Sequence, residues 1–147
     1  MKERYLPITV TIIVFLAIFL AGGAMFKHFL STQVLGDLLA DNAFVIIAAI
    51  GTTFVIISGG IDLSIGSMIG FVGVVVAHLV SLGWHPLAAG AAMILFGIVY
   101  GGCVGAIIDA CDIQPFIITL AGLFLLRGAC FMVSLDSIPI SHPFVEA

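Results

Sequence analysis

Two apolar runs are separated by the decapeptide Ser58-Gly59-Gly60-Ile61-Asp62-Leu63-Ser64-Ile65-Gly66-Ser67. Its paired glycines interrupt a helix, because glycine loses the most backbone entropy on ordering. A carboxylate is costly where lipid surrounds it, so Asp62 must lie at a surface or inside a bundle of helices. The decapeptide therefore predicts a break between membrane helices, either a surface loop or an interrupted helix within a bundle.

The composition predicts that lipid surrounds most of the chain. The 147 residues are 63% hydrophobic and 8% charged, whereas soluble domains carry about 25% charged residues. Four Lys or Arg and eight Asp or Glu cannot cover a water-facing surface of this size. The net charge of −4 lacks the basic footprint that nucleic-acid binding requires, so no nucleic-acid partner is expected.

Five apolar runs approach the length of about 20 residues that crosses a bilayer. They are Leu6–Phe26, Ala43–Ser58, Leu63–Leu82, Leu87–Ile108 and Phe116–Leu135. The first run has the outline of a signal peptide, but its 21 residues exceed the roughly 7–15 apolar residues of such a segment. We therefore expect an uncleaved first span and an all-α, polytopic transmembrane helix bundle, with residues 1–147 in one domain.

Two further features concern the first part of the chain. Lys2 and Arg4 precede the first run and favour a cytoplasmic N-terminus. Between the first two runs, the segment 30–42 carries apolar residues at helical spacing. This spacing predicts a short amphipathic helix at the membrane interface.

Glycines recur four residues apart on two of the predicted helices. They are Gly66 and Gly70 in the third run and Gly97, Gly101 and Gly105 in the fourth. Small residues at this spacing let helix backbones approach closely in lipid. We expect these glycines to form packing faces, against either another helix of this chain or a second subunit.

The candidate functional residues at the break are Gly59, Gly60, Asp62, Ser64 and Ser67. One interpretation is structural: Asp62 or Ser64 accepts hydrogen bonds from free N–H groups at the start of the next helix. The other is functional, because interrupted helices are a common device in transporters. If Asp62 lies at the membrane surface it is mainly a cap, and if it lies within the bundle it lines a path.

Arg127 is a charged residue inside the fifth run, eleven residues from its start. At 1.5 Å per residue this is roughly 16 Å deep, near the middle of a bilayer. An arginine there costs roughly 2.5–3.5 kcal/mol and needs a partner. Asp62 or a further part of the bundle could supply that partner. Alternatively, the helix starts later and Arg127 extends to a surface.

No pattern of catalysis is evident. The sequence lacks a Ser-His-Asp grouping, paired carboxylates and a phosphate-binding loop with its lysine. Cys103, Cys111 and Cys130 have no metal-ligand spacing. We therefore predict no catalytic residue, cofactor or metal ligand. A membrane-embedded enzyme is disfavoured, and the main alternative to a transporter is a small membrane anchor or assembly protein that packs through its glycine faces.

Two long motifs resemble those of permeases of bacterial sugar ABC importers of the ribose and galactose type. The first is 59–67 within the decapeptide. The second is Pro115-Phe116-Ile117-Ile118-Thr119-Leu120-Ala121-Gly122, followed by Leu126-Arg127-Gly128. Further similarity at 41–44, 53–56 and 137–140 is greatest to the permeases of galactofuranose importers. The resemblance adds Thr119 to the candidate path residues.

The resemblance implies a function and a set of partners. Such permeases have about ten spans and about twice this length, so the chain is similar to an N-terminal half. It would form part of a sugar path in the bacterial inner membrane, with a second permease subunit, a cytoplasmic ATPase subunit and a periplasmic sugar-binding protein. The chain itself would not be an enzyme, and residues 1–147 alone would not transport.

Overall fold

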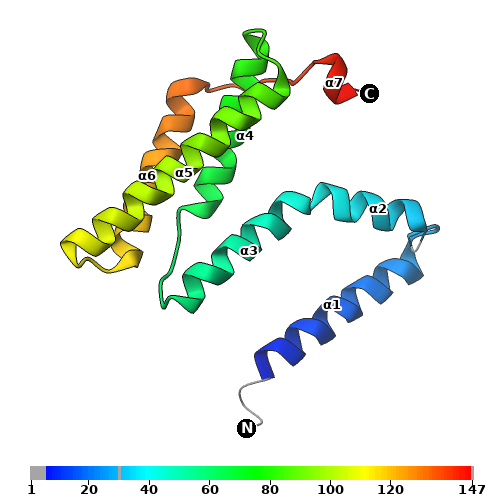
Figure 1. The fold of residues 1–147 in the computed structure, drawn as a ribbon. Coiled ribbons are helices and arrows are strands. Elements are labelled where there is room, and N and C mark those ends of the chain that lie inside the picture. The colour runs from blue at the N-terminus through cyan, green and yellow to red at the C-terminus, as the bar shows by residue number, and fades with distance from the viewer. Residues whose placement is uncertain (1–5, 30, 147) are drawn as a thin grey trace. The chain divides into compact units, whose positions relative to one another are not determined.

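The computed structural model describes residues 6–29 and 31–146, and these residues form seven helices and no strand. Figure 1 shows their order along the chain. The helices are α1 (Leu6–Met25), α2 (Thr32–Asp41), α3 (Ala43–Ile57), α4 (Ile65–Ser81), α5 (Pro86–Cys111), α6 (Pro115–Val133) and α7 (Pro143–Glu146). The predicted all-α class is confirmed.

Each of the five predicted apolar runs overlaps one helix, but the helices differ in length. Among the described residues, α1, α5 and α6 are long and apolar enough to cross a membrane. Helices α2 and α3 would pass only as a pair, bent by 51° at the junction between them. Helix α4 has 17 residues. Of the five helices in these runs, the two that the decapeptide connects, α3 and α4, are thus the shortest, and five separate spans remain a prediction.

The N-terminal compact unit, Met1–Ile47, contains α1 and α2. The ring of Phe29 lies 5.4 Å from that of Phe19, centroid to centroid, against the helix face that carries Gly22. Ser31 caps α2, because its side chain accepts a hydrogen bond from the N–H of Val34 at 3.3 Å. A short helix in the segment 30–42 is therefore confirmed. Residues 2 and 4, on which the predicted orientation rests, lie outside the described residues.

The C-terminal compact unit, Ala48–Ala147, is built around α4. Helix α4 packs against both α6 and α5, and the three helices lie side by side in Figure 1. Its small apolar core consists of Ala77, Val80, Ala89, Met93 and Leu126. Most other large apolar side chains of the described residues are exposed. Such a surface suits helices whose solvent is lipid.

Proline and a left-handed residue fix the ends of the long helices. Pro86 and Pro115 each stand in the first turn of their helix, where the missing N–H leaves no hydrogen bond unmade. Helix α5 extends three residues beyond the predicted run and ends at Asp112, whose φ is 51°. Helix α6 therefore starts at a short, defined distance from the end of α5, beside the break.

Candidate functional site

Helix α3 ends in a glycine cap. The N–H of Gly59 donates to the carbonyl of Ile56 at 3.0 Å, and the N–H of Gly60 donates to that of Val55 at 2.9 Å. Gly59 has φ +81°, the left-handed conformation that glycine adopts without steric cost. The two glycines therefore terminate α3 and turn the chain toward α4.

Asp62 organises the start of α4. Its Oδ1 accepts hydrogen bonds from the backbone N–H of Ser64 at 2.8 Å and from the Ser64 hydroxyl at 2.7 Å. Ser64 occupies the N-cap position of α4, but its own side chain accepts no capping bond. Asp62 and Ser64 were the two predicted capping residues. Of these, Asp62 is the one that accepts a hydrogen bond from an N–H at the helix start. The hydroxyl of Ser64 instead fixes the Asp62 carboxylate.

Thr119 of α6 forms a hydrogen bond with the break, the segment 58–64 between α3 and α4. Its hydroxyl donates to the carbonyl of Ile61 at 3.0 Å, between residues 58 positions apart in the sequence. The carbonyl of Phe116, in the preceding turn of α6, lies 3.3 Å from the same hydroxyl. Ser64 and Thr119 are only 2% and 3% exposed. The segment between α3 and α4 is thus tied to a buried position of α6.

Tyr100 and Gly122 are the residues that sequence reasoning missed. The hydroxyl of Tyr100 occupies the space into which a Cβ at position 122 would project, and Ser64 Cβ lies 3.5 Å from the same point. The Tyr100 oxygen is buried and has no hydrogen-bond partner within the described part of the chain. A tyrosine in an otherwise apolar helix was the available signal. Its contact with Gly122 depends on how α5 and α6 pack.

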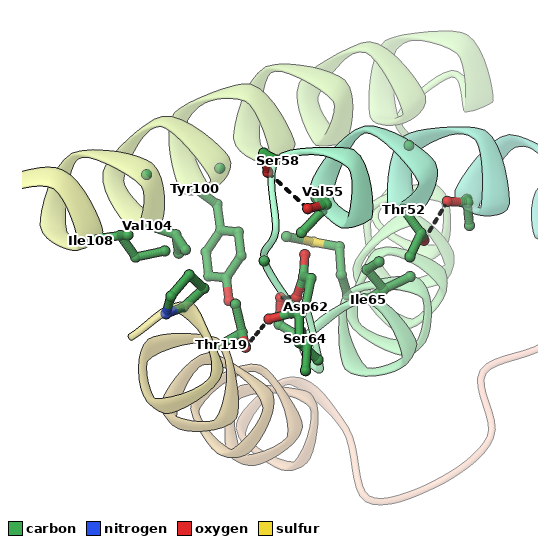
Figure 2. A pocket seen from close by; sticks show the side chains of 18 of the residues that line it. Thr52, Val55, Ser58, Asp62, Ser64, Ile65, Tyr100, Val104, Ile108 and Thr119 are labelled. Atoms are coloured by element: carbon green, nitrogen blue, oxygen red, sulfur yellow. Dashed lines mark hydrogen bonds between the residues drawn. The ribbon is translucent and has the colours of Figure 1, made fainter. Parts of the chain in front are cut away.

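These groups border a cleft of about 860 Å³ within the C-terminal unit. Figure 2 shows the labelled side chains around it, from α3, the break, α4, α5 and α6. The polar side chains that line it are those of Thr52, Ser58, Asp62, Ser64, Tyr100 and Thr119. Glycines line it at 51, 59, 60, 97, 101 and 105. An apolar cavity with a few convergent polar groups is the usual form of a small-molecule site.

The predicted candidate residues fall into two places. Gly59, Gly60, Asp62, Ser64 and Thr119 line the cleft together. The remaining two, Ser67 and Arg127, border a second hollow of about 360 Å³, with Leu63, Gly66, Gly70, Leu123 and Cys130.

The suggested pairing of Asp62 with Arg127 is absent. Asp62 Oδ1 is bonded to Ser64, and no ion pair joins the Asp62 carboxylate to Arg127. Arg127 is exposed on α6 and borders the second hollow, whereas Asp62 lines the cleft.

The five glycines predicted to pack face open space in the described chain. A Cβ at position 66, 70, 97, 101 or 105 would meet no other atom within 4 Å. The first two border the second hollow and the other three line the cleft. Their role in helix packing therefore remains a prediction, and it requires a neighbour other than the helices described.

Comparison with known proteins identifies the class. Residues 34–137 match the family model described as branched-chain amino acid transport system, permease component. The chain belongs to this family of permease components. Together with its apolar helices, this makes it a multi-pass membrane protein.

Individual relatives are all permease proteins. The chain is 48% identical over 147 residues to the inner membrane ABC transporter permease protein YjfF of Escherichia coli, covering 99% of this chain and 44% of YjfF. It is 32% identical to the fructose import permease protein FruG of Bifidobacterium longum, covering 94% of this chain and 41% of FruG. It is 35% identical to the ribose import permease protein RbsC of Escherichia coli, covering 81% of this chain and 37% of RbsC.

The chain spans less than half the length of these curated relatives. All three are named as permeases and none as an enzyme, in agreement with the prediction from the sequence. No solved structure gave a significant match to the chain.

Proposed function

We propose that the chain is part of the permease subunit of an ATP-driven monosaccharide importer in the bacterial inner membrane. The cleft beside the decapeptide would form a section of the sugar path. Family membership supports the transport class, and the names of the fructose and ribose import permeases support sugar as the cargo. The single observation that supports the cleft's role is that its serine and threonine hydroxyls already donate their protons within the chain.

Four hydroxyl protons at the cleft are already committed. Thr52 and Ser58 donate to backbone carbonyls of α3, each at 2.8 Å. Ser64 donates to Asp62, and Thr119 donates to the carbonyl of Ile61. These oxygens keep their lone pairs, and the Asp62 carboxylate is an acceptor when ionised. The Tyr100 hydroxyl is the one donor of the lining side chains that has no partner among the described residues, so the cleft presents mainly acceptors.

A surface of acceptors selects for a ligand rich in donors. A neutral sugar carries a donor on every hydroxyl, so it can satisfy these acceptors as it loses water. A sugar phosphate or sugar acid brings negative charge toward Asp62 and is disfavoured, because like charges repel most strongly where the effective dielectric constant is low. The cleft thus supports an uncharged monosaccharide as the cargo.

The finer assignments rest on the resemblance of the motifs. Among monosaccharides we propose galactofuranose or a related sugar. The partners would be a cytoplasmic ATPase subunit, a second permease subunit and a periplasmic sugar-binding protein, within membrane lipid. The N-terminus would be cytoplasmic. Residues 1–147 would not transport alone, because they span only 44% of the length of YjfF.

A chimera tests the transport function. Residues 1–147 replace the matching segment of YjfF, and the uptake of labelled monosaccharides, galactofuranose included, is measured in a strain that lacks its own permeases for them. We expect ATP-dependent uptake by the chimera and none by residues 1–147 expressed alone. Native YjfF and the native ribose import permease serve as references.

Two results would contradict the proposal. Uptake by residues 1–147 alone would show that no further part is needed. A chimera that inserts into the membrane and transports no sugar that native YjfF transports would favour a membrane anchor. In that case purification of the chimera should recover neither an ATPase subunit nor a sugar-binding protein, whereas a permease should recover both.

A further inference from the structure

Arg127 stands far from either end of an apolar helix. It is residue 13 of the 19 in α6, about 18 Å from the helix start and about 9 Å from its end at 1.5 Å per residue. Its side chain is exposed on this chain, and no hydrogen bond or ion pair to it occurs among the side chains described in residues 6–29 and 31–145. A cation at this depth in a membrane helix requires an anionic or water-filled surrounding.

None of the four aspartates that the structure describes in the same unit provides that anion. Asp62 lines the cleft and is bonded to Ser64. Asp109 and Asp112 lie at the C-terminal end of α5, and Asp136 follows the end of α6. A second copy of the unit would bring the same acids, again at helix ends and at the break. None of these four aspartates lies in an apolar helix away from its ends, so a carboxylate at the depth of Arg127 is to be sought on another helix.

The surface beside Arg127 has room for such a helix. Gly66, Ser67 and Gly70 of α4 border one side of the second hollow, and Leu123 and Cys130 of α6 border the other. A Cβ at Gly66 or Gly70 would meet no atom within 4 Å. Small residues let a neighbouring backbone approach closely where lipid provides no hydrophobic driving force.

We propose that the hollow between α4 and α6 seats a transmembrane helix from outside this chain, which carries an aspartate or glutamate that pairs with Arg127. The occupant is defined by charge complementarity and by the open glycine surface. The proposal is independent of the transported substrate, because the hollow and the cleft have no lining residue in common.

A binding experiment in lipid vesicles tests this pairing. The purified chain is labelled with a fluorescent donor, and two labelled apolar peptides of about 20 residues serve as probes. One peptide has aspartate at its centre and the other has leucine. We expect the aspartate peptide to associate about tenfold more tightly with the wild-type chain. The advantage should disappear in Arg127→Leu.

Two glycine variants distinguish docking in the hollow from a nonspecific attraction of charges. Gly70→Leu fills the hollow and keeps Arg127, so it should weaken binding of the aspartate peptide. Gly102→Leu is the matched control, because Gly102 also faces open space, on α5, and does not border the hollow. Binding to this control should equal that of the wild type. Circular dichroism verifies equal helix content in each variant.

Three outcomes would overturn the proposal. The first is equal binding of both peptides to the wild-type chain, as expected if Arg127 extends to the membrane surface. The second is undiminished binding of the aspartate peptide to Arg127→Leu or Gly70→Leu. The third is self-association of the chain through Gly70 that excess aspartate peptide does not displace, which would make a second copy the occupant.

Discussion

Tyr100 and Gly122 show how one missing Cβ determines a helix contact. The Tyr100 hydroxyl reaches the backbone of α6 at the only kind of residue that leaves space for it. Ser64 approaches the same point from the start of α4. Gly122 is therefore a point at which side chains from α5 and from the start of α4 both reach α6. Because Gly122 has no Cβ, the Tyr100 hydroxyl can lie against the backbone of α6.

We predict that Gly122→Ala destabilises the chain by about 1–3 kcal/mol, because the added methyl group overlaps Tyr100 and forces the helices apart. The free energy of unfolding in mixed detergent measures this. Gly128→Ala on the same helix faces open space and should be neutral or slightly stabilising. Tyr100→Phe removes the obstructing oxygen and should restore part of the loss. An equal loss in both alanine variants would contradict the steric explanation.

The hydroxyl of Thr119 should contribute specifically to the order of the break. Thr119→Val removes its hydrogen bond to Ile61 and should cost about 1 kcal/mol in the free energy of unfolding. Amide exchange at residues 59–64 should accelerate at the same time. Thr53→Val provides the comparison, because the Thr53 hydroxyl bonds only within its own helix, to Ala49. Unchanged exchange in Thr119→Val would mean that other contacts hold the break.

Single residues differ in how far the sequence predicts them. Asp62 was predictable, because an acid beside paired glycines serves the start of the next helix locally. The absence of an Asp62–Arg127 pair was not predictable, because an ion pair depends on tertiary distances that apolar periodicity does not encode. Tyr100 was missed for the same reason. Its role follows from the packing of α5 on α6, and apolar helices offer no polar face from which that packing could be read.

At the level of the helices, the break leaves both of its neighbours, α3 and α4, too short to be full membrane spans. The glycine cap ends α3 after 15 residues and α4 continues for 17, both below the about 20 residues of a full span. The apolar runs and the helices agree to within one residue where local chemistry sets the helix end, at the glycine cap and at Pro115. At the end of α5 the helix continues three residues past the apolar run, through Asp109 and Cys111. Polar residues at a helix end do not by themselves stop it.

We predict that Gly59→Ala weakens the cap of α3. The φ of +81° is costly for alanine, by about 1–2 kcal/mol, although its Cβ would meet no neighbouring atom. The loss should therefore come from the backbone alone. Gly51→Ala in the interior of α3, also in open space, should stabilise by up to about 1 kcal/mol. Unfolding free energies of both variants provide the test, and a stabilised Gly59→Ala would rule out the left-handed cap.

For the whole molecule, the cleft and the second hollow share one property. Both are bordered by glycines whose missing side chains leave open space in the described chain. The apolar core is correspondingly small. Such glycines are of little use to the stability of the C-terminal unit. Their role is to leave space for a molecule or a helix that enters the cleft or the hollow. A larger side chain at such a glycine should therefore impair function without lowering the stability of the fold.

Gly101→Leu is the sharpest test of that separation. Gly101 lines the cleft and faces open space, so leucine should change the unfolding free energy of the chain by no more than about 0.5 kcal/mol. In the chimera with YjfF, the same side chain would project into the cleft and should abolish most sugar uptake. Gly102→Leu is the matched control, because Gly102 is next to Gly101 and equally open but does not line the cleft. If Gly101→Leu kept full uptake while Gly102→Leu lost it, the sugar path would have to lie on another face of α5.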